Sequence, residues 1–142
     1  MSEDDEDFER LPPAHPRFSG HFTHRLYDPD DYENDELPPF GSDEGSDEIH
    51  DWAERLDELR QNPTLRYMLG DDADEQIREL SATAQVDVDD ILIGLGFTLL
   101  RFTGQIDPEG RQWLLDALTR QQQHTRQREY IQLRADLISF PG

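Results

Sequence analysis

Apolar residues recur every three or four positions from residue 46 onward, and this spacing predicts a series of α-helices. A first helix is expected over 47–61, because Ser46 is a suitable N-cap and two acidic residues follow it in the first turn. A proline would end that helix and begin a short one over 63–69. A further helix is expected over 73–85.

The segment 88–103 is apolar on every face, unlike the helices predicted before it. Helices of this kind are normally surrounded by others, so this one should lie at the centre of the fold. Gly94 and Gly96 within it each cost about 1 kcal/mol relative to alanine, and the expected compensation is the close approach of another helix. Gly104 would end it. Its apolar residues are Ile91, Leu92, Ile93, Leu95, Phe97, Leu99, Leu100 and Phe102.

The helices predicted around this central segment are short, and each offers one narrow apolar face. We expect them to leave part of the central helix uncovered, and exposed apolar area of this kind usually marks an interface. The sequence therefore predicts a homodimer, with an ordinary small bundle closed by its loops as the alternative. The residues expected to mediate self-association are Leu92, Gly94, Leu95, Gly96 and Leu99.

The C-terminal part of the chain predicts one long helix. Asp107-Pro108 supplies an N-cap followed by proline at the first helical position. No strongly apolar residue occurs over 119–129, so this stretch is expected to project into solvent as a helix or to act as a flexible linker. Apolar residues return over 130–140, where they fold back on the body, pair with another copy of the chain or bind a different protein. The expected fold is all-α, a small helical bundle over 46–142 with an extended C-terminal helix.

Residues 1–45 predict a tail rather than a part of the bundle. Six of the nine prolines lie there, and proline removes a backbone donor and clashes with the preceding helical turn. Low aliphatic content and dense acidic residues are typical of segments that are disordered in isolation. We expect a disordered acidic-aromatic tail over 1–45, joined to a folded body over 46–142.

Aromatic residues recur within this acidic tail, where a purely solvating segment would have little use for them. Rings among carboxylates suit a segment that docks into grooves of a partner while its acidic groups meet arginine or lysine. The alternative is that the rings pack on the chain's own body. The residues expected to bind the partner are Phe8, Phe18, Phe22, Tyr27, Tyr32 and Phe40.

The formal net charge is −20, and it is uneven along the chain. Residues 1–50 carry sixteen Asp and Glu against three Arg, whereas residues 108–142 carry four against five, and lysine is absent. This balance disfavours phosphate backbones and anionic lipids and favours a protein partner with a basic surface. Plain solubility, or adaptation to a salty cytoplasm, is an equally good explanation. The sequence leaves open whether the arginine-rich stretch 120–134 forms a second binding surface.

The chain carries no sign of a membrane or nucleic-acid role. No basic and apolar signal pattern is found at the acidic N-terminus, and the longest apolar run, 91–100, is too short to span a bilayer. A helix-turn-helix outline over 75–101 is disfavoured as a DNA reader, because its second helix opens with aspartates. We expect a soluble cytoplasmic protein with no membrane partner and no direct nucleic-acid partner.

Catalytic and metal-binding chemistry is limited by the residue types that the chain lacks. Without cysteine there is no thiol nucleophile, and without lysine there is no Schiff base or phosphate-loop lysine. His21 and His24, with His15 and the aspartates of 28–31 nearby, resemble metal ligands, but structural zinc normally requires four fixed ligands. We expect no enzyme activity, no catalytic residue, no cofactor and no bound metal.

These features together predict a non-catalytic adaptor or regulator that binds a basic partner surface through its acidic-aromatic tail. Dimerisation would double the number of tails and raise avidity. Two other functions stay open. One is mimicry of a nucleic acid, which would inhibit a DNA- or RNA-binding protein and would need ordered carboxylates at phosphate-like spacing. The other is a structural subunit of a larger particle.

Overall fold

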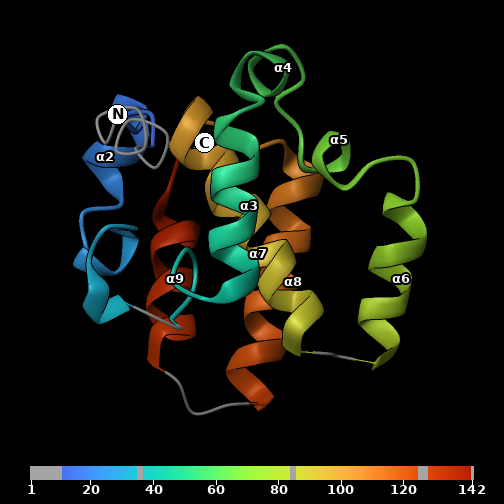
Figure 1. The fold of residues 1–142 in the computed structure, drawn as a ribbon. Helices are drawn as coiled ribbons and strands as arrows, with labels where there is room; N and C mark the ends of the chain where they lie inside the picture. Colours follow the sequence, from blue (N-terminus) through green and yellow to red (C-terminus); the bar gives the residue numbers. More distant parts are fainter. Residues whose placement is uncertain (1–10, 35–36, 84–85, 125–127, 142) are drawn as a thin grey trace.

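The computed structural model describes residues 11–34, 37–83, 86–124 and 128–141. Within these ranges the chain folds into a small all-α bundle without strands, which confirms the predicted fold class. None of the helices in them is both long and apolar enough to cross a membrane. Figure 1 shows the elements, which are α2 (Pro16–His21), the 3-10 helices η1 (Arg25–Tyr27) and η2 (Tyr32–Asn34), α3 (Asp43–Ala53), α4 (Leu56–Gln61), α5 (Leu65–Leu69), α6 (Ala73–Thr83), α7 (Val86–Thr103), α8 (Pro108–His124) and α9 (Arg128–Ser139).

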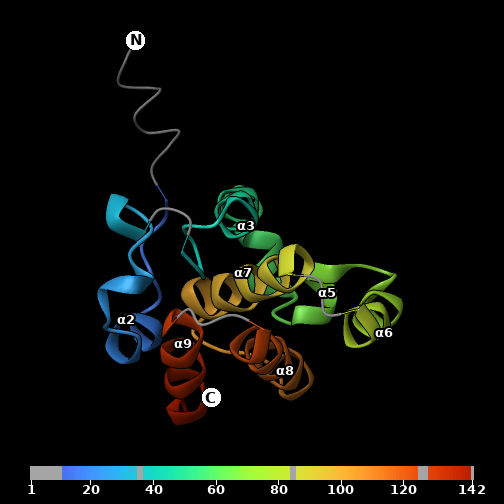
Figure 2. The same cartoon turned by 90° about the horizontal axis from the view of Figure 1, so that it is seen from below.

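Helix α7 lies at the centre of the bundle, as its uniformly apolar sequence predicts. Helix α3 covers one side of it, and α8 and α9 lie on the opposite side (Figure 2), while α2, α4 and α5 add further contacts. Phe97, Leu99 and Leu100 are fully buried between these layers. Complete burial of one such side chain contributes about 1.5–3 kcal/mol, so α7 is the element around which the others assemble.

The prediction that α7 offers a face to a second copy of the chain is wrong. Leu92, Leu95 and Leu99 are at most 3% exposed, because the chain's own helices cover them. Gly94 and Gly96 also lie against residues of the same chain. Part of the missing cover comes from residues assigned to the tail, such as Phe22 and Tyr27, whose rings pack on Phe97. A single chain thus encloses this core.

The close helix approach predicted at Gly94 is confirmed, and it is a backbone-to-backbone crossing of α3 and α7. A Cβ atom added to Gly94 would lie 2.7 Å from the Cα atom of Gly45. One added to Gly45 would overlap the carbonyl oxygen of Pro39, and one added to Gly96 would lie 2.6 Å from Cδ2 of Leu114. Side chains are therefore excluded where α3 crosses α7.

Residues 11–34 and 37–45 belong to the bundle, so the predicted boundary between 45 and 46 is wrong. Helix α3 begins at Asp43, and the hydroxyl of Ser42 accepts a hydrogen bond from the N–H of Gly45 at 3.1 Å. Ser46 was the predicted N-cap, and both serines precede two acidic residues. Only a start at Ser42 places Gly45 inside the helix, where it crosses α7.

The predicted extended C-terminal helix is two helices instead. Helix α8 ends at His124, and α9 packs back against it with Leu133 and Leu137 fully buried. Arg111 of α8 donates hydrogen bonds to three backbone carbonyl oxygens at the C-terminal end of α9, at 2.8–3.1 Å. These bonds satisfy groups that a helix end leaves unpaired. The apolar cluster over 130–140 thus folds back on the body, as one of the three predicted alternatives requires.

Two buried carboxylates near the N-terminus of α7 fix the positions of α8 and α9. Asp89 is fully buried and accepts hydrogen bonds from the guanidinium of Arg120 at 2.7 Å and from the side-chain amide of Gln121 at 2.6 Å. Asp90 accepts one from the hydroxyl of Tyr130 at 2.9 Å, and burial raises the pKa of that hydroxyl. Because a buried charge without such partners is costly, these bonds select which turn of each helix faces α7.

Replacing Gly94 with alanine tests the helix crossing. The added methyl group has to push α3 away from α7, and we expect a loss of about 1–3 kcal/mol in the free energy of unfolding, even though alanine favours a helix. Urea unfolding measures this loss. Gly20→Ala is the control, because no atom lies within 4 Å of its added Cβ, and it should be neutral or slightly stabilising. Equal effects of the two substitutions would contradict the crossing.

Asp89→Ala tests the buried polar contacts between α7 and α8. We expect a loss of about 3–5 kcal/mol in the free energy of unfolding, because Arg120 keeps its charge in a largely buried position without a partner. The double variant Asp89→Leu with Arg120→Leu should recover most of the loss, since it removes both charges. Asp116→Ala, at an exposed position of α8, is the control and should change stability by less than about 0.5 kcal/mol.

Candidate protein-binding surface

Four of the six aromatic residues predicted to bind a partner are buried in the chain's own core. Phe18, Phe22, Tyr27 and Phe40 are each at most 3% exposed. The rings of Phe18 and Phe22 stack with centroids 4.8 Å apart, and Phe22 meets the edge of Tyr27 at 5.1 Å. The prediction is wrong for these four, because contacts with one another and with α7 already remove them from water. The other two are Phe8, which lies outside the described residues, and Tyr32, which begins η2 and whose side chain lies outside them.

Polar contacts hold this N-terminal segment against the rest of the bundle. The hydroxyl of Tyr27 donates a hydrogen bond to the carboxylate of Asp136 at 2.6 Å, and Nε2 of His21 donates one to the backbone carbonyl of Asp136 at 2.9 Å. The N–H of His15 donates to the carbonyl oxygen of Arg101 at 2.6 Å. Burial, and then the bond to Asp136, raise the pKa of Tyr27. The segment is therefore fixed to α7 and α9 at several points.

Two of the histidines that resemble metal ligands in the sequence each use a ring nitrogen to accept a backbone hydrogen bond within the fold. Nδ1 of His15 accepts a hydrogen bond from the N–H of Arg17 at 3.1 Å, and Nδ1 of His24 accepts one from the N–H of Leu26 at 3.0 Å. These bonds cap α2 and η1. In the part of the chain that the structure describes, no group of three or more His, Asp or Glu side chains is placed to hold a metal ion.

A contact between His21 and Ser139 resembles two members of a catalytic triad. Nε2 of His21 lies 3.0 Å from the hydroxyl oxygen of Ser139 and 2.9 Å from the carbonyl oxygen of Asp136. Because a carbonyl oxygen can only accept, Nε2 must carry a proton, and it cannot serve as the base that activates the hydroxyl. The contact therefore ties α2 to the end of α9 rather than preparing a nucleophile.

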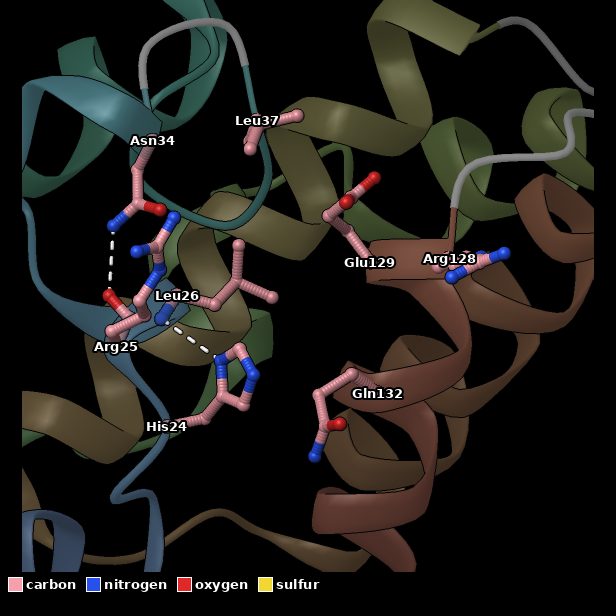
Figure 3. A pocket seen from close by; sticks show the side chains of 8 residues that line it. All are labelled: His24, Arg25, Leu26, Asn34, Leu37, Arg128, Glu129 and Gln132. Atoms are coloured by element: carbon pink, nitrogen blue, oxygen red, sulfur yellow. Dashed lines mark hydrogen bonds between the residues drawn. The ribbon is translucent and has the colours of Figure 1, made fainter.

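A hollow of about 280 Å³ lies between η1 and α9 (Figure 3). Nδ1 of His24 accepts a hydrogen bond there, so Nε2 carries the proton of the neutral ring. The amide of Asn34 donates to the carbonyl oxygens of Arg25 and Asp28, and the guanidinium of Arg25 pairs with Glu33 at 3.0 Å. No nucleophile lies beside a free base among the lining residues. These are His24, Arg25, Leu26, Asn34, Leu37, Arg128, Glu129 and Gln132.

Helix α3 presents a row of carboxylates to solvent because its opposite face is buried. Gly45, Ile49 and Trp52 are buried, and helical periodicity turns the residues between them outward. Four exposed carboxylates, the last of them on the C-cap residue Glu54, follow one another on that outer side at spacings of four, four and three residues, so neighbours lie about 4.5–6 Å apart along the axis. We name them the acidic face of α3. They are Asp43, Asp47, Asp51 and Glu54.

The rest of the chain does little to neutralise the acidic face of α3. Among the described residues, Asp51 is the one carboxylate of the four with an ion-pair partner, Arg55 at 3.9 Å, and Arg55 also pairs with Glu58. Burial, and then repulsion by Asp51 and Asp47, raise the pKa of the neighbouring Glu48. Arg55 opposes this rise, so the negative charge on α3 is only partly compensated.

The acidic face of α3 is a feature that the sequence-based prediction missed. Its signal is present in the sequence, because the acidic positions are four or three residues apart and lie opposite Ile49 and Trp52. The predicted helix start at Ser46 assigned Asp43 to the tail and hid the full row. Correct placement of the N-cap at Ser42 reveals it.

Glu48→Gln tests the cost of holding a charged carboxylate at this half-buried position beside Asp51 and Asp47. The raised pKa of Glu48 means that the folded state holds the proton to higher pH than the unfolded chain, so this group lowers stability as pH rises past its ordinary range. The substitution should therefore raise Tm by about 1–2 °C at pH 7 and leave it unchanged at about pH 3. Thermal unfolding followed by circular dichroism measures both, with Glu75→Gln on α6 as the control. A gain of equal size at both pH values would contradict the electrostatic cause.

Comparison of the chain with models of protein families, with curated proteins and with solved structures found no match. The evidence for function is therefore the geometry and charge of the described residues. Among these, the acidic face of α3 is the feature best suited to a partner, since it is ordered, exposed and weakly neutralised.

Proposed function

We propose that this chain is a non-catalytic adaptor or regulator that binds a basic surface of a partner protein through the acidic face of α3. The observation that carries the proposal is an ordered row of four exposed carboxylates with a single ion-pair partner among the described residues. The binding role predicted for the tail is thereby assigned to a folded helix.

The packing of α3 makes these carboxylates a preorganised surface. The backbone crossing at Gly45 and Gly94 holds the helix against α7, and the buried side chains of Ile49 and Trp52 fix its rotation. Carboxylates held by a rigid helix need less further ordering when arginine or lysine side chains approach, which lowers the entropy cost of binding. Opposite charges also speed the encounter, and this contribution falls as salt concentration rises.

Three observations support a non-catalytic role. The sequence has neither cysteine nor lysine, which removes thiol and Schiff-base chemistry. The contact between His21 and Ser139 engages Nε2 as a donor, so it offers no base to the hydroxyl. The hollow of Figure 3 likewise lacks a nucleophile beside a free base among its lining residues.

Mimicry of a nucleic acid is a second candidate, favoured by the regular spacing of carboxylates along α3. Acidic residues are also dense over 28–36 and 71–90 and would favour this candidate if they shared one face, but η2 and α6 lie on opposite sides of the bundle (Figure 1). The acidic face of α3 supplies the ordered row instead. Under this candidate the partner surface is the basic channel of a nucleic-acid-binding protein.

The proposed surface is tested with an octa-arginine peptide as the basic probe, titrated against the full chain at low salt. The quadruple variant Asp43→Asn, Asp47→Asn, Asp51→Asn and Glu54→Gln should raise Kd about tenfold or more, since each exposed pair contributes about 0.2–1 kcal/mol. Fluorescence anisotropy measures the change, and a tenfold increase in salt should remove most of the difference.

The matched control removes the same charge elsewhere on the surface. Asp71→Asn, Asp72→Asn, Asp116→Asn and Glu75→Gln change four exposed carboxylates on other elements. This variant should raise Kd by about twofold at most, because distant charges are screened. Equal losses in the two variants would mean that net charge alone attracts the peptide, and the proposed surface would be rejected.

A further inference from the structure

The solvent side of α9 differs from the rest of the described surface, because it carries large apolar side chains. Ile131 is 52% exposed and Ile138 is 51% exposed, and the small, exposed Ala135 lies between them. Spacings of four and three residues place the three on one side of the helix, with the isoleucines about 10 Å apart along the axis. Tyr67 on α5 is the other large apolar side chain exposed in the described ranges. The isoleucines therefore form an apolar stripe.

Two arginines flank this stripe, and the carboxylates of α9 point elsewhere. Arg128 and Arg134 lie on either side of it by helical periodicity. Arg134 donates to the hydroxyl of Thr119 at 3.1 Å, and among the described residues neither arginine has an ion-pair partner. The carboxylate of Asp136 accepts a hydrogen bond from the hydroxyl of Tyr27. Figure 3 shows Arg128 and Glu129 near the start of α9, where both help to line the hollow.

The positive charge beside this apolar stripe favours a partner segment that carries negative charge. The chain as a whole carries −20, so an uncompensated cationic and apolar strip is the opposite of its average surface. A second copy docked through the same stripe in an antiparallel pair would bring the two Arg134 side chains together near the twofold axis, which is unfavourable. A segment with an apolar anchor between carboxylates would fill the stripe and neutralise both arginines.

We propose that Arg128, Ile131, Arg134, Ala135 and Ile138, together the outer face of α9, form a docking surface for an acidic peptide segment with an aromatic or aliphatic anchor. The anchor lies against Ile131, which is midway along the helix axis between the two arginines, with Ala135 beside it. Carboxylates on either side of it meet the two arginines, which stand about 9 Å apart along the axis. Three residues of extended chain span about that distance.

This surface is separate from the acidic face of α3 and opposite to it in charge. Figure 2 shows α3 and α9 on different sides of α7. The inference does not rest on the proposed function, since it uses other residues and another class of partner. A chain with both surfaces would be able to bridge a basic and an acidic partner.

The test uses a labelled decapeptide with the sequence of residues 1–10, which places Phe8 among six carboxylates. The receptor is the full chain carrying Phe8→Ser, so that its own copy of this sequence lacks the anchor. We expect saturable binding by fluorescence anisotropy at low salt. Ile131→Ser with Ile138→Ser should weaken it about tenfold or more, and so should Arg128→Gln with Arg134→Gln. A peptide with serine in place of the phenylalanine should bind about fivefold more weakly.

The control receptor carries Tyr67→Ser and Arg60→Gln, which remove an exposed ring and an exposed arginine from α5 and α4. It should bind the peptide like its parent, and the quadruple variant of the acidic face of α3 should bind it no more weakly. Absence of saturable binding, or an equal loss in the control, would overturn the proposal. So would sedimentation that shows a dimer abolished by the isoleucine substitutions, because the occupant would then be a second copy. Circular dichroism verifies that each variant is folded.

Discussion

The crossing of α3 and α7 without intervening side chains is the constraint on which the rest of the structure depends. Gly94 meets the backbone of Gly45, and Gly45 in turn leaves no room for a side chain beside Pro39. The two helices thus approach as closely as their backbones allow, and Ile49 and Trp52 are driven into the core. The cost of glycine in a helix, about 1 kcal/mol each, is offset by this burial. The orientation of the acidic face of α3 follows directly, because only one side of the helix is left for solvent.

Buried polar contacts complete what the apolar core leaves undetermined. Apolar packing is non-directional, so neighbouring helices could pack on an apolar helix such as α7 at several rotations about their own axes. Asp89 and Asp90 remove this freedom, since each requires a particular donor on α8 or α9. Asp136 does the same for the N-terminal segment through Tyr27. Two arginines of the C-terminal stretch therefore have different roles. Arg120 pairs with Asp89 inside the bundle, whereas Arg134 lies nearer the surface, where it donates to Thr119.

Local signals in the sequence predicted several helix ends, but they missed the break that divides 47–61 into α3 and α4, and they carried no information on contacts between distant residues. Asp107 caps α8 through the N–H of Gly110, and Gly70 and Gly104 end helices with positive φ, as the sequence indicates. The segment 11–45 was misjudged because its prolines forbid a long helix but allow short ones, and Pro16 in fact begins α2. Its rings pack on α7, far along the chain, which no local pattern reveals. The acidic face of α3 was missed because Ser42 and Ser46 are equally suitable N-caps in the sequence.

Because the exposed carboxylates of α3 and the arginines of α9 lie on different sides of α7 (Figure 2), these two groups would together contribute an electric dipole along that direction. A charged macromolecule exerts a torque on such a dipole before any contact is made. Collisions would then arrive already oriented, with the negative pole turned toward a cationic body and the positive pole turned away. The fraction of productive encounters would exceed that of a uniformly acidic particle of the same net charge.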